Sequence, residues 1–278
     1  MKKFKERLKD SRNLILMTAF VLAAAALFSG SNGSNKVSAQ GKSEKLIPGK
    51  NYSWYFVPVP DNKQPDFDVD LCELKKYGAY ALGNNDDKVI YLTFDFGFEN
   101  GNVKKCLDAL NANGVKGAFF ILENVLKRNA DLIREIAETG HTVANHTLKH
   151  KNMCYVTDFE AYEKELLGLE ELYEATTGCK MAKYFRPPEG TFTIQNLEYN
   201  KKLGFKTIFW SVAYKDWDAN SQPDPAETVR KILKRTHNGA VVLLHPTSDT
   251  NAAILDILIK EWKKLGYRFG TLDELTAE

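Results

Sequence analysis

Segments with the pattern of a buried strand alternate regularly with segments typical of amphipathic helices from residue 89 to residue 271. The predicted strands are 89–96, 117–122, 141–146, 183–186, 207–212, 240–245 and 267–271, and the helices between them are 102–113, 129–139, 157–176, 194–203, 225–237 and 251–265. Glycines fall where the helices should end, as left-handed caps do, at Gly114, Gly140, Gly178, Gly204, Gly239 and Gly266. This alternation favours an α/β fold with a parallel sheet closed, or nearly closed, into a distorted (β/α)7 barrel.

The first 39 residues have the composition of a signal peptide. Six Lys or Arg residues lie within residues 1–13, an uncharged apolar stretch follows from Leu14 to Phe28, and Val37-Ser38-Ala39 resembles a cleavage site. The stretch is shorter than the roughly 20 residues that span a bilayer, which favours a cleaved signal over a retained anchor. Either alternative predicts an extracytoplasmic protein that contacts a membrane only through an uncleaved leader.

Residues 40–87 are rich in Pro, Asn, Asp, Tyr and Trp and show no sustained period, so we expect an irregular N-terminal arm before a domain at 88–273. Without residues 1–39 the chain has 31 basic and 34 acidic side chains. It has no basic stripe with interleaved aromatic residues, so a nucleic-acid partner is not expected. The four cysteines form no C-x-x-C pair, and Cys106 has the spacing of a buried helix face.

Five polar residues lie at or just past the carboxyl ends of predicted strands, and they are Asp95, His146, Arg186, Asp216 and His245. A parallel α/β barrel builds its active site from these strand ends and the loops after them. The pattern therefore predicts that one pocket holds all five side chains.

Each motif also has a purely structural interpretation. Asp95 can act as a general base, orient a water molecule or bind a metal, or it can cap the following helix. His146 and His150 have i, i+4 spacing, which on a helical turn would put both imidazoles on one face as in helical metal sites, but they can also be solvated loop residues. His245 follows four apolar residues and is expected to be partly buried, as many core histidines are.

The sequence Arg186-Pro187-Pro188-Glu189-Gly190 predicts a stiff turn after a strand, because two prolines fix φ. Such a turn can hold an arginine against a carboxylate or aim a backbone N–H at an oxyanion. The alternative is that the turn has a structural role alone. The carboxylate of Asp216 can tune the pKa of a neighbouring imidazole, and the indole of Trp217 can stack on a sugar face. The alternative is that Asp216 is a solvated loop acid and Trp217 a core residue.

Taken together, Thr93 to Gly97, His146 to His150, Arg186 to Gly190, Asp216-Trp217 and Leu243 to His245 resemble, in order and spacing, the motifs of the polysaccharide deacetylases. This family is also described as the NodB-homology domain or carbohydrate esterase family 4. Phe94 to Gly101, Phe209 to Ala213 and the aromatic arm around Asn51 to Tyr55 look most like the subgroup that makes muramic δ-lactam in spore cortex peptidoglycan.

The resemblance implies metal-assisted amide hydrolysis of an acetylated glycan. By this resemblance Asp95 is the base, His245 the acid, Arg186 the residue that orients Asp95, and Asp216 the residue that tunes His245. His146 and His150 are the implied ligands of a divalent metal ion, zinc or similar. Trp217, Pro188 and the backbone N–H of Glu189 are the implied substrate contacts.

The chain departs from the family pattern at two positions. Phe96 and Ala213 stand where many members have aspartate, and the first departure leaves only two imidazoles as matching metal ligands. The δ-lactam subgroup also lacks an aspartate at the position of Phe96, so the implied substrate is peptidoglycan with peptide-stripped N-acetylmuramic acid. The alternatives are a deacetylase of N-acetylglucosamine or another polysaccharide, and a non-catalytic wall-glycan-binding protein.

Overall fold

The computed structural model describes residues 43–277, within a compact unit that spans residues 41–278. The predicted signal peptide at 1–39 lies outside the described residues. Within residues 43–277, no helix is both long enough and apolar enough to cross a membrane.

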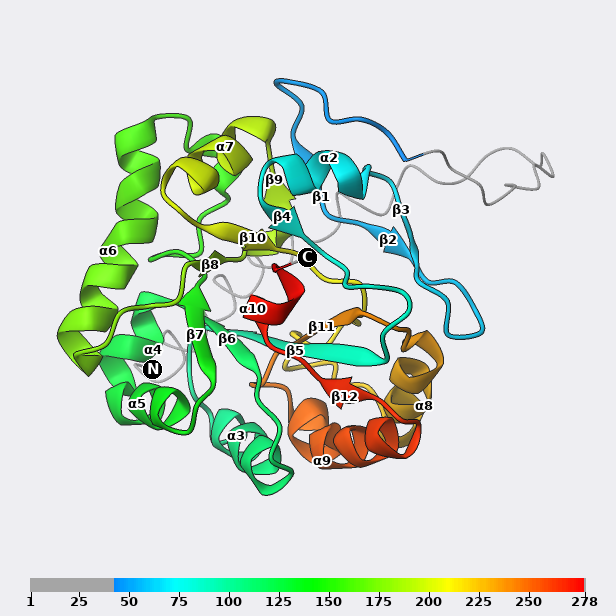
Figure 1. The fold of residues 1–278 in the computed structure, drawn as a ribbon. Helices are drawn as coiled ribbons and strands as arrows, with labels where there is room; N and C mark the ends of the chain where they lie inside the picture. Colours follow the sequence, from blue (N-terminus) through cyan, green and yellow to red (C-terminus); the bar gives the residue numbers. More distant parts are fainter. Residues whose placement is uncertain (1–42, 278) are drawn as a thin grey trace, which may run out of the picture. The chain divides into compact units, whose positions relative to one another are not determined.

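A curled parallel sheet forms the centre of this unit (Figure 1). Its strands run in the order β11-β5-β6-β7-β8-β10-β4, and β12 also pairs with β5. Their bounds are β4 Ala79–Tyr80, β5 Val89–Phe96, β6 Ala118–Ile121, β7 Thr142–Asn145, β8 Tyr184–Phe185, β10 Lys206–Ile208, β11 Ala240–Leu244 and β12 Arg268–Phe269. The parallel pairings confirm the predicted distorted (β/α)7 barrel.

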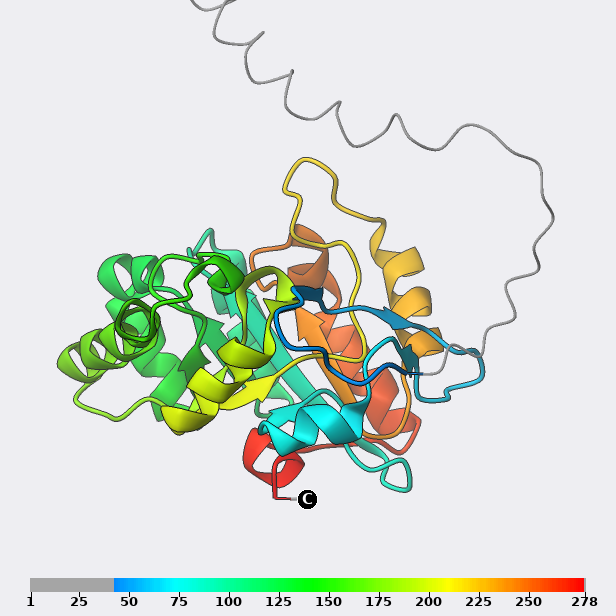
Figure 2. The same ribbon diagram turned by 90° about the horizontal axis from the view of Figure 1, so that it is seen from above.

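Helices surround the sheet on its outer side (Figures 1 and 2). They are α3 Asn102–Ala112, α4 Glu123–Arg128, α5 Ala130–Glu138, α6 Phe159–Thr177, α7 Ile194–Lys202, α8 Pro225–Arg235 and α9 Asp249–Lys264. The short helix α10 (Leu272–Leu275) lies instead within the ring of strands, where its leucines pack against the interior of the barrel (Figure 1). Local capping explains several boundaries: Asp158 accepts from the amide of Ala161 at the start of α6, and Gly178 ends it in the left-handed conformation. Helix α4 was not predicted, because its six residues are too few to show a helical period.

The N-terminal arm contributes to the sheet instead of only covering it. Strand β4 pairs with β10, and Leu82 bridges to Ala240 at the start of β11. The arm therefore fills the gap between β10 and β11. Nearer the carboxyl ends of these strands, Val212 and Val242 bridge the same gap. The sequence did not predict β4, because a two-residue strand is too short for a periodic pattern.

Short pairings and aromatic packing hold the rest of the arm. Strand β1 (Tyr52–Ser53) pairs with β9 (Thr191–Phe192), and β2 (Phe56–Val57) pairs with β3 (Asp66–Phe67), before α2 (Leu71–Lys76). Trp54 stacks on Phe209 with ring centroids 4.4 Å apart and donates from Nε1 to the Trp210 carbonyl at 2.8 Å.

Strand β5 lies at the centre of the core and is buried at all eight positions. One face contributes to the barrel interior with Phe120 and Ile208, and the other packs under the helices with Cys106. The prediction that Cys106 is a core residue is confirmed, and all four cysteines are free thiols. Because both faces of β5 are buried, its carboxyl end is held rigidly, and this end carries Asp95.

Candidate active site

The carboxyl ends of the strands open into a cleft of about 500 Å³. Among the predicted site residues, Asp95, His146, His150, Trp217 and His245 line it. Arg186 and Asp216 are buried behind the cleft and contact Asp95 and His245, respectively. The structure therefore gathers all five polar strand-end residues at one site. The volume is in the range of small-ligand pockets.

Asp95 is the buried acid of the cleft, with 4% of its surface exposed. Its Oδ1 accepts a hydrogen bond from Arg186 Nη1 at 2.7 Å. Burial alone would raise the pKa of Asp95, but the positive charge of Arg186, with contributions from His146 and His245, outweighs burial and lowers it. The carboxylate is therefore ionised at neutral pH and available to accept a proton.

Arg186 is fixed on every side. Its Nε donates to the Ile208 carbonyl at 3.0 Å, its Nη2 donates to Thr93 Oγ1 at 2.9 Å, and its guanidinium carbon lies 4.3 Å from the centroid of the Phe120 ring. The stiff turn at Pro187 begins directly after it. A fully buried guanidinium with these contacts can hold the Asp95 carboxylate in one orientation.

His146 is oriented by the backbone next to it. Its Nδ1 lies 2.8 Å from the Arg186 carbonyl oxygen. Because that oxygen can only accept, Nδ1 carries the proton, and Nε2 keeps its lone pair 3.8 Å from Asp95 Oδ2. Burial lowers the pKa of His146 to about 4, so the ring is neutral at pH 7, as a metal ligand must be.

His150 reaches the site from a loop and not from a helical turn, which was the other arrangement that its spacing from His146 allowed. Thr147 and His150 both have left-handed backbones, with φ of 73° and 55°, which interrupts any helix. The His150 amide donates to Thr147 Oγ1 at 2.9 Å and closes the loop. The rings of His146 and His150 nevertheless lie 5.0 Å apart at an angle of 72°.

The donor set suits a loosely held metal ion. Within residues 43–277, no three His, Cys, Asp or Glu side chains are grouped to hold one. Phe96 packs edge-on against Phe119, with centroids 6.0 Å apart, and offers no ligand atom. The two imidazoles of His146 and His150 fit an ion such as zinc that completes its coordination with water.

His245 also lines the cleft and has a buried acid, Asp216, behind it. Its Nδ1 donates to Asp216 Oδ1 at 2.7 Å, and its backbone amide donates to Asp216 Oδ2 at 2.8 Å. The Asn251 amide also donates to Asp216 Oδ2, at 2.6 Å. Burial lowers the pKa of His245, but the hydrogen bond and charge of Asp216 outweigh burial, and the net effect raises the pKa above 6.5. The imidazole is thus suited to carry a proton.

Two exposed aromatic residues, Trp217 and Phe98, line the cleft, with 63% and 56% of their surface accessible. Figure 2 shows the connection between β10 and α8, which carries Trp217, extending beyond the neighbouring helices. Pro188 and Glu189 follow Arg186 but do not line the cleft. Glu189 has a left-handed backbone, with φ of 59°, and its carboxylate accepts from Asn152 Nδ2 at 3.0 Å.

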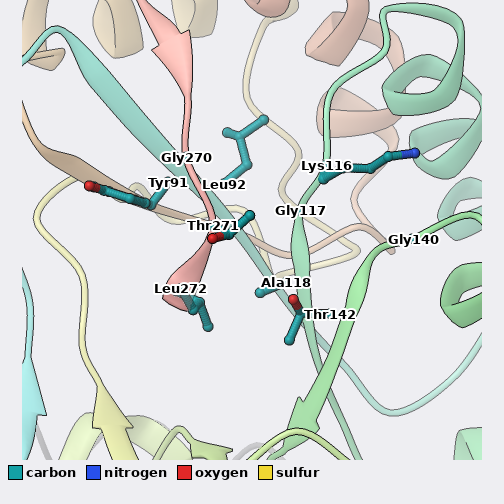
Figure 3. Close-up of a pocket in the computed structure, with 10 residues that line it drawn as sticks. All are labelled: Tyr91, Leu92, Lys116, Gly117, Ala118, Gly140, Thr142, Gly270, Thr271 and Leu272. Atoms are coloured by element: carbon teal, nitrogen blue, oxygen red, sulfur yellow. The ribbon is translucent and has the colours of Figure 1, made fainter. Parts of the chain in front are cut away.

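A second, much smaller pocket lies at the amino-terminal ends of β5, β6 and β7 (Figure 3). Gly117, Gly140 and Gly270 form part of its wall, and Lys116 is the one charged residue among the described residues that line it. This pocket is at the opposite end of the strands from Asp95. Its described lining offers no acid and base pair, so the chemistry belongs to the larger cleft.

Sequence reasoning missed several parts of the site. Asn251, which holds Asp216, lies in the first turn of α9 and has no strand-end signal. Asn124 and Arg128 line the cleft from α4. Their position directly after a predicted strand is the signal that could have found them.

Comparisons with known proteins agree with these features. Residues 82–208 match the family model for polysaccharide deacetylases. The chain is 37% identical over 235 residues to the peptidoglycan-N-acetylmuramic acid deacetylase PdaA of Bacillus subtilis (strain 168), covering 84% of this chain and 89% of that protein. It is 32% identical over 205 residues to a peptidoglycan-N-acetylglucosamine deacetylase of Bacillus cereus, covering 72% and 92%.

Solved structures give the same relationship. The structure of B. subtilis PdaA, a family 4 carbohydrate esterase, matches with a TM-score of 0.79 and 36% identity, covering 83% of this chain and 99% of that chain. A family 4 pseudoenzyme from Bacillus anthracis matches with a TM-score of 0.66 and 27% identity, covering 75% and 72%. Fold, site and matches define a hydrolase that acts on carbon–nitrogen bonds other than peptide bonds. The chain belongs to the polysaccharide deacetylase family, as its motifs predicted.

Proposed function

We propose that this chain removes the N-acetyl group of N-acetylmuramic acid in peptidoglycan and so leads to muramic δ-lactam in the spore cortex. The observation that carries this proposal is the similarity to PdaA, a peptidoglycan-N-acetylmuramic acid deacetylase, along 89% of its length. The substrate also supports an extracytoplasmic site of action, in the cell wall or forespore envelope, in agreement with the leader-like composition of residues 1–39.

Two proton-transfer groups face the cleft in the proposed mechanism. Asp95, held by Arg186, accepts a proton from the attacking water. His245, held by Asp216, donates a proton to the nitrogen of the departing amine, which leaves poorly without one. The carbon–nitrogen bond breaks, and acetate and a free amine are the products.

Three of the remaining predicted residues position the ion and the substrate in this proposal. His146 and His150 hold a divalent ion, which when bound acidifies water and polarises the amide carbonyl. Trp217, which lines the cleft, stacks on a sugar face, whereas Pro188 and Glu189 do not line the cleft and take no part in this mechanism. The freed amine lies beside the lactyl carboxylate of the same sugar, and ring closure between the two forms the lactam with loss of water.

The product of the reaction tests the proposal directly. Peptide-stripped peptidoglycan incubated with the protein should yield muramic acid residues that have lost their acetyl group, detected by mass analysis of muropeptides. Muramic acid that still carries its peptide should not react, because its lactyl group is neutral and bulky. Equal turnover of muramic acid with and without peptide would contradict the proposal.

N-acetylglucosamine deacetylation is the second candidate function, because a relative with that name is 32% identical. Deacetylated glucosamine as the main product would establish it. A non-catalytic role is the third alternative, since a pseudoenzyme shares the fold. Asp95 is hydrogen-bonded to Arg186 and His245 to Asp216, and this arrangement of an acid and a base favours a catalytic role.

Removal of the metal should abolish activity, and added divalent ions should restore it. Because His146 offers a free Nε2 and Phe96 offers no ligand atom, His146→Ala should weaken metal binding much more than Phe96→Ala does. We expect a loss of at least about 10-fold for His146→Ala, since even outer-shell partners contribute this much. Competition with a chromophoric chelator measures the affinity, and full activity of metal-stripped protein would contradict the assignment.

A further inference from the structure

We propose that Arg128, with Asn124, forms a carboxylate-binding subsite in the cleft that selects acetylated sugars bearing an acidic substituent. This inference rests on the proposed function and deepens it, because the lactyl group is what distinguishes muramic acid from glucosamine. Both residues line the same cleft as Asp95, His146 and His245. They are four residues apart on α4, so both side chains lie on one face of this helix.

The charge of Arg128 is available to a ligand. Among residues 43–277, no carboxylate is paired with it. The nearest acid in sequence, Glu123, is instead paired with two lysines: Lys127 lies 2.8 Å away, and Lys149 contacts its other oxygen. Arg128 is also exposed, so its guanidinium has not lost its hydration to the protein interior.

The rest of the cleft lining, as far as the structure describes it, carries no competing anion. Asp95 is the one carboxylate among the described lining residues, and Arg186 already neutralises that charge. Arg128 is the one lysine or arginine in this same described set, and Phe96 adds an apolar surface beside Asp95. A negatively charged substituent that enters the cleft therefore meets, within residues 43–277, one unpaired cation and no unpaired anion.

Guanidinium geometry suits the proposed ligand. The planar fork of an arginine can donate two parallel hydrogen bonds to a carboxylate, which makes it a selective partner for that group. The side-chain amide of Asn124, one turn before Arg128 on the same helix, can donate a further hydrogen bond. A lactyl ether on a bound sugar presents such a carboxylate, whereas the hydroxyl of glucosamine at the same carbon does not.

Kinetic constants for two substrates test this inference. Arg128→Gln should lower kcat/KM for peptide-stripped muramic acid chains by about 10-fold or more, mainly through KM, as expected for loss of a charged hydrogen bond. Its kcat/KM for N-acetylglucosamine oligomers should not change. Lys127→Gln is the matched control, because it removes a neighbouring charge outside the cleft and leaves Glu123 paired with Lys149. An equal effect of Arg128→Gln on both substrates, or no effect, would overturn the inference.

A binding measurement separates this inference from the proposed function. Titration of the protein with free N-acetylmuramic acid and with N-acetylglucosamine should show tighter binding of the acidic sugar, and Arg128→Gln should remove the difference. Equal binding by the unmodified protein would refute the subsite whatever the enzyme hydrolyses. If δ-lactam forms normally and Arg128→Gln has no effect, the inference fails while the proposed function stands.

Discussion

Asp95→Asn should reduce deacetylation by about 10² to 10⁴, the range that a general base contributes. The reason is chemical, because an amide oxygen can still accept the bond from Arg186 Nη1 but cannot take a proton from water. The substitution is nearly isosteric, and Arg186 keeps its bonds to Thr93 and Ile208, so we expect the barrel to remain folded. Acetate release from peptide-stripped peptidoglycan measures the effect.

Asp218→Asn provides a control for this experiment. Asp218 pairs with Lys215 on the loop that carries Trp217, and it does not line the cleft. Its substitution removes one carboxylate from the same side of the molecule and should leave activity close to that of the unmodified protein. Circular dichroism of both variants verifies the fold. Activity of Asp95→Asn above about a tenth of the normal value would contradict the assignment of Asp95 as the base.

The position of Asp95 also explains why the barrel could be predicted from the sequence. Strand β5 is an eight-residue, mainly apolar segment with both faces buried, and such segments stand out even without alternation. The same holds for β11, which pairs with β5 from Ala240 to Leu244 and ends one residue before His245. The clear sequence patterns of β5 and β11 therefore predicted both the fold and the positions of Asp95 and His245, the base and the acid of the proposed mechanism.

Short elements and long-range contacts could not be predicted. Strand β4 has two residues, and its place in the sheet depends on its pairing with β10, far along the chain. The loop from His146 to His150 brings two imidazoles together through left-handed residues, which no periodic pattern reveals. Helix α4 was missed for its length, and with it Arg128.

Asp216→Asn should lower kcat by at least about tenfold at neutral pH and move the alkaline limb of the pH–rate profile to lower pH. Burial lowers the pKa of His245, and the hydrogen bond and charge of Asp216 overcome this effect and raise it above 6.5. The acid form is present below the raised pKa and is lost as the pH rises through it. Without the charge of Asp216 the effect of burial dominates, so His245 releases its proton at lower pH.

The shape of the profile distinguishes this role of Asp216 from a merely structural one. The side-chain oxygen of the Asp216→Asn variant can still accept from Nδ1 of His245, but its NH2 group then faces the two donors to Oδ2, the His245 amide and the Asn251 side chain. Activity can therefore fall through lost positioning alone, but a purely structural role predicts little change in the alkaline limb. His245→Gln should remove that limb altogether, because the titrating acid is absent. If the profile of Asp216→Asn keeps its alkaline limb in place while activity falls, Asp216 positions the ring but does not set its pKa. A shift to lower pH together with a lower kcat instead supports His245 as the proton donor to the departing amine.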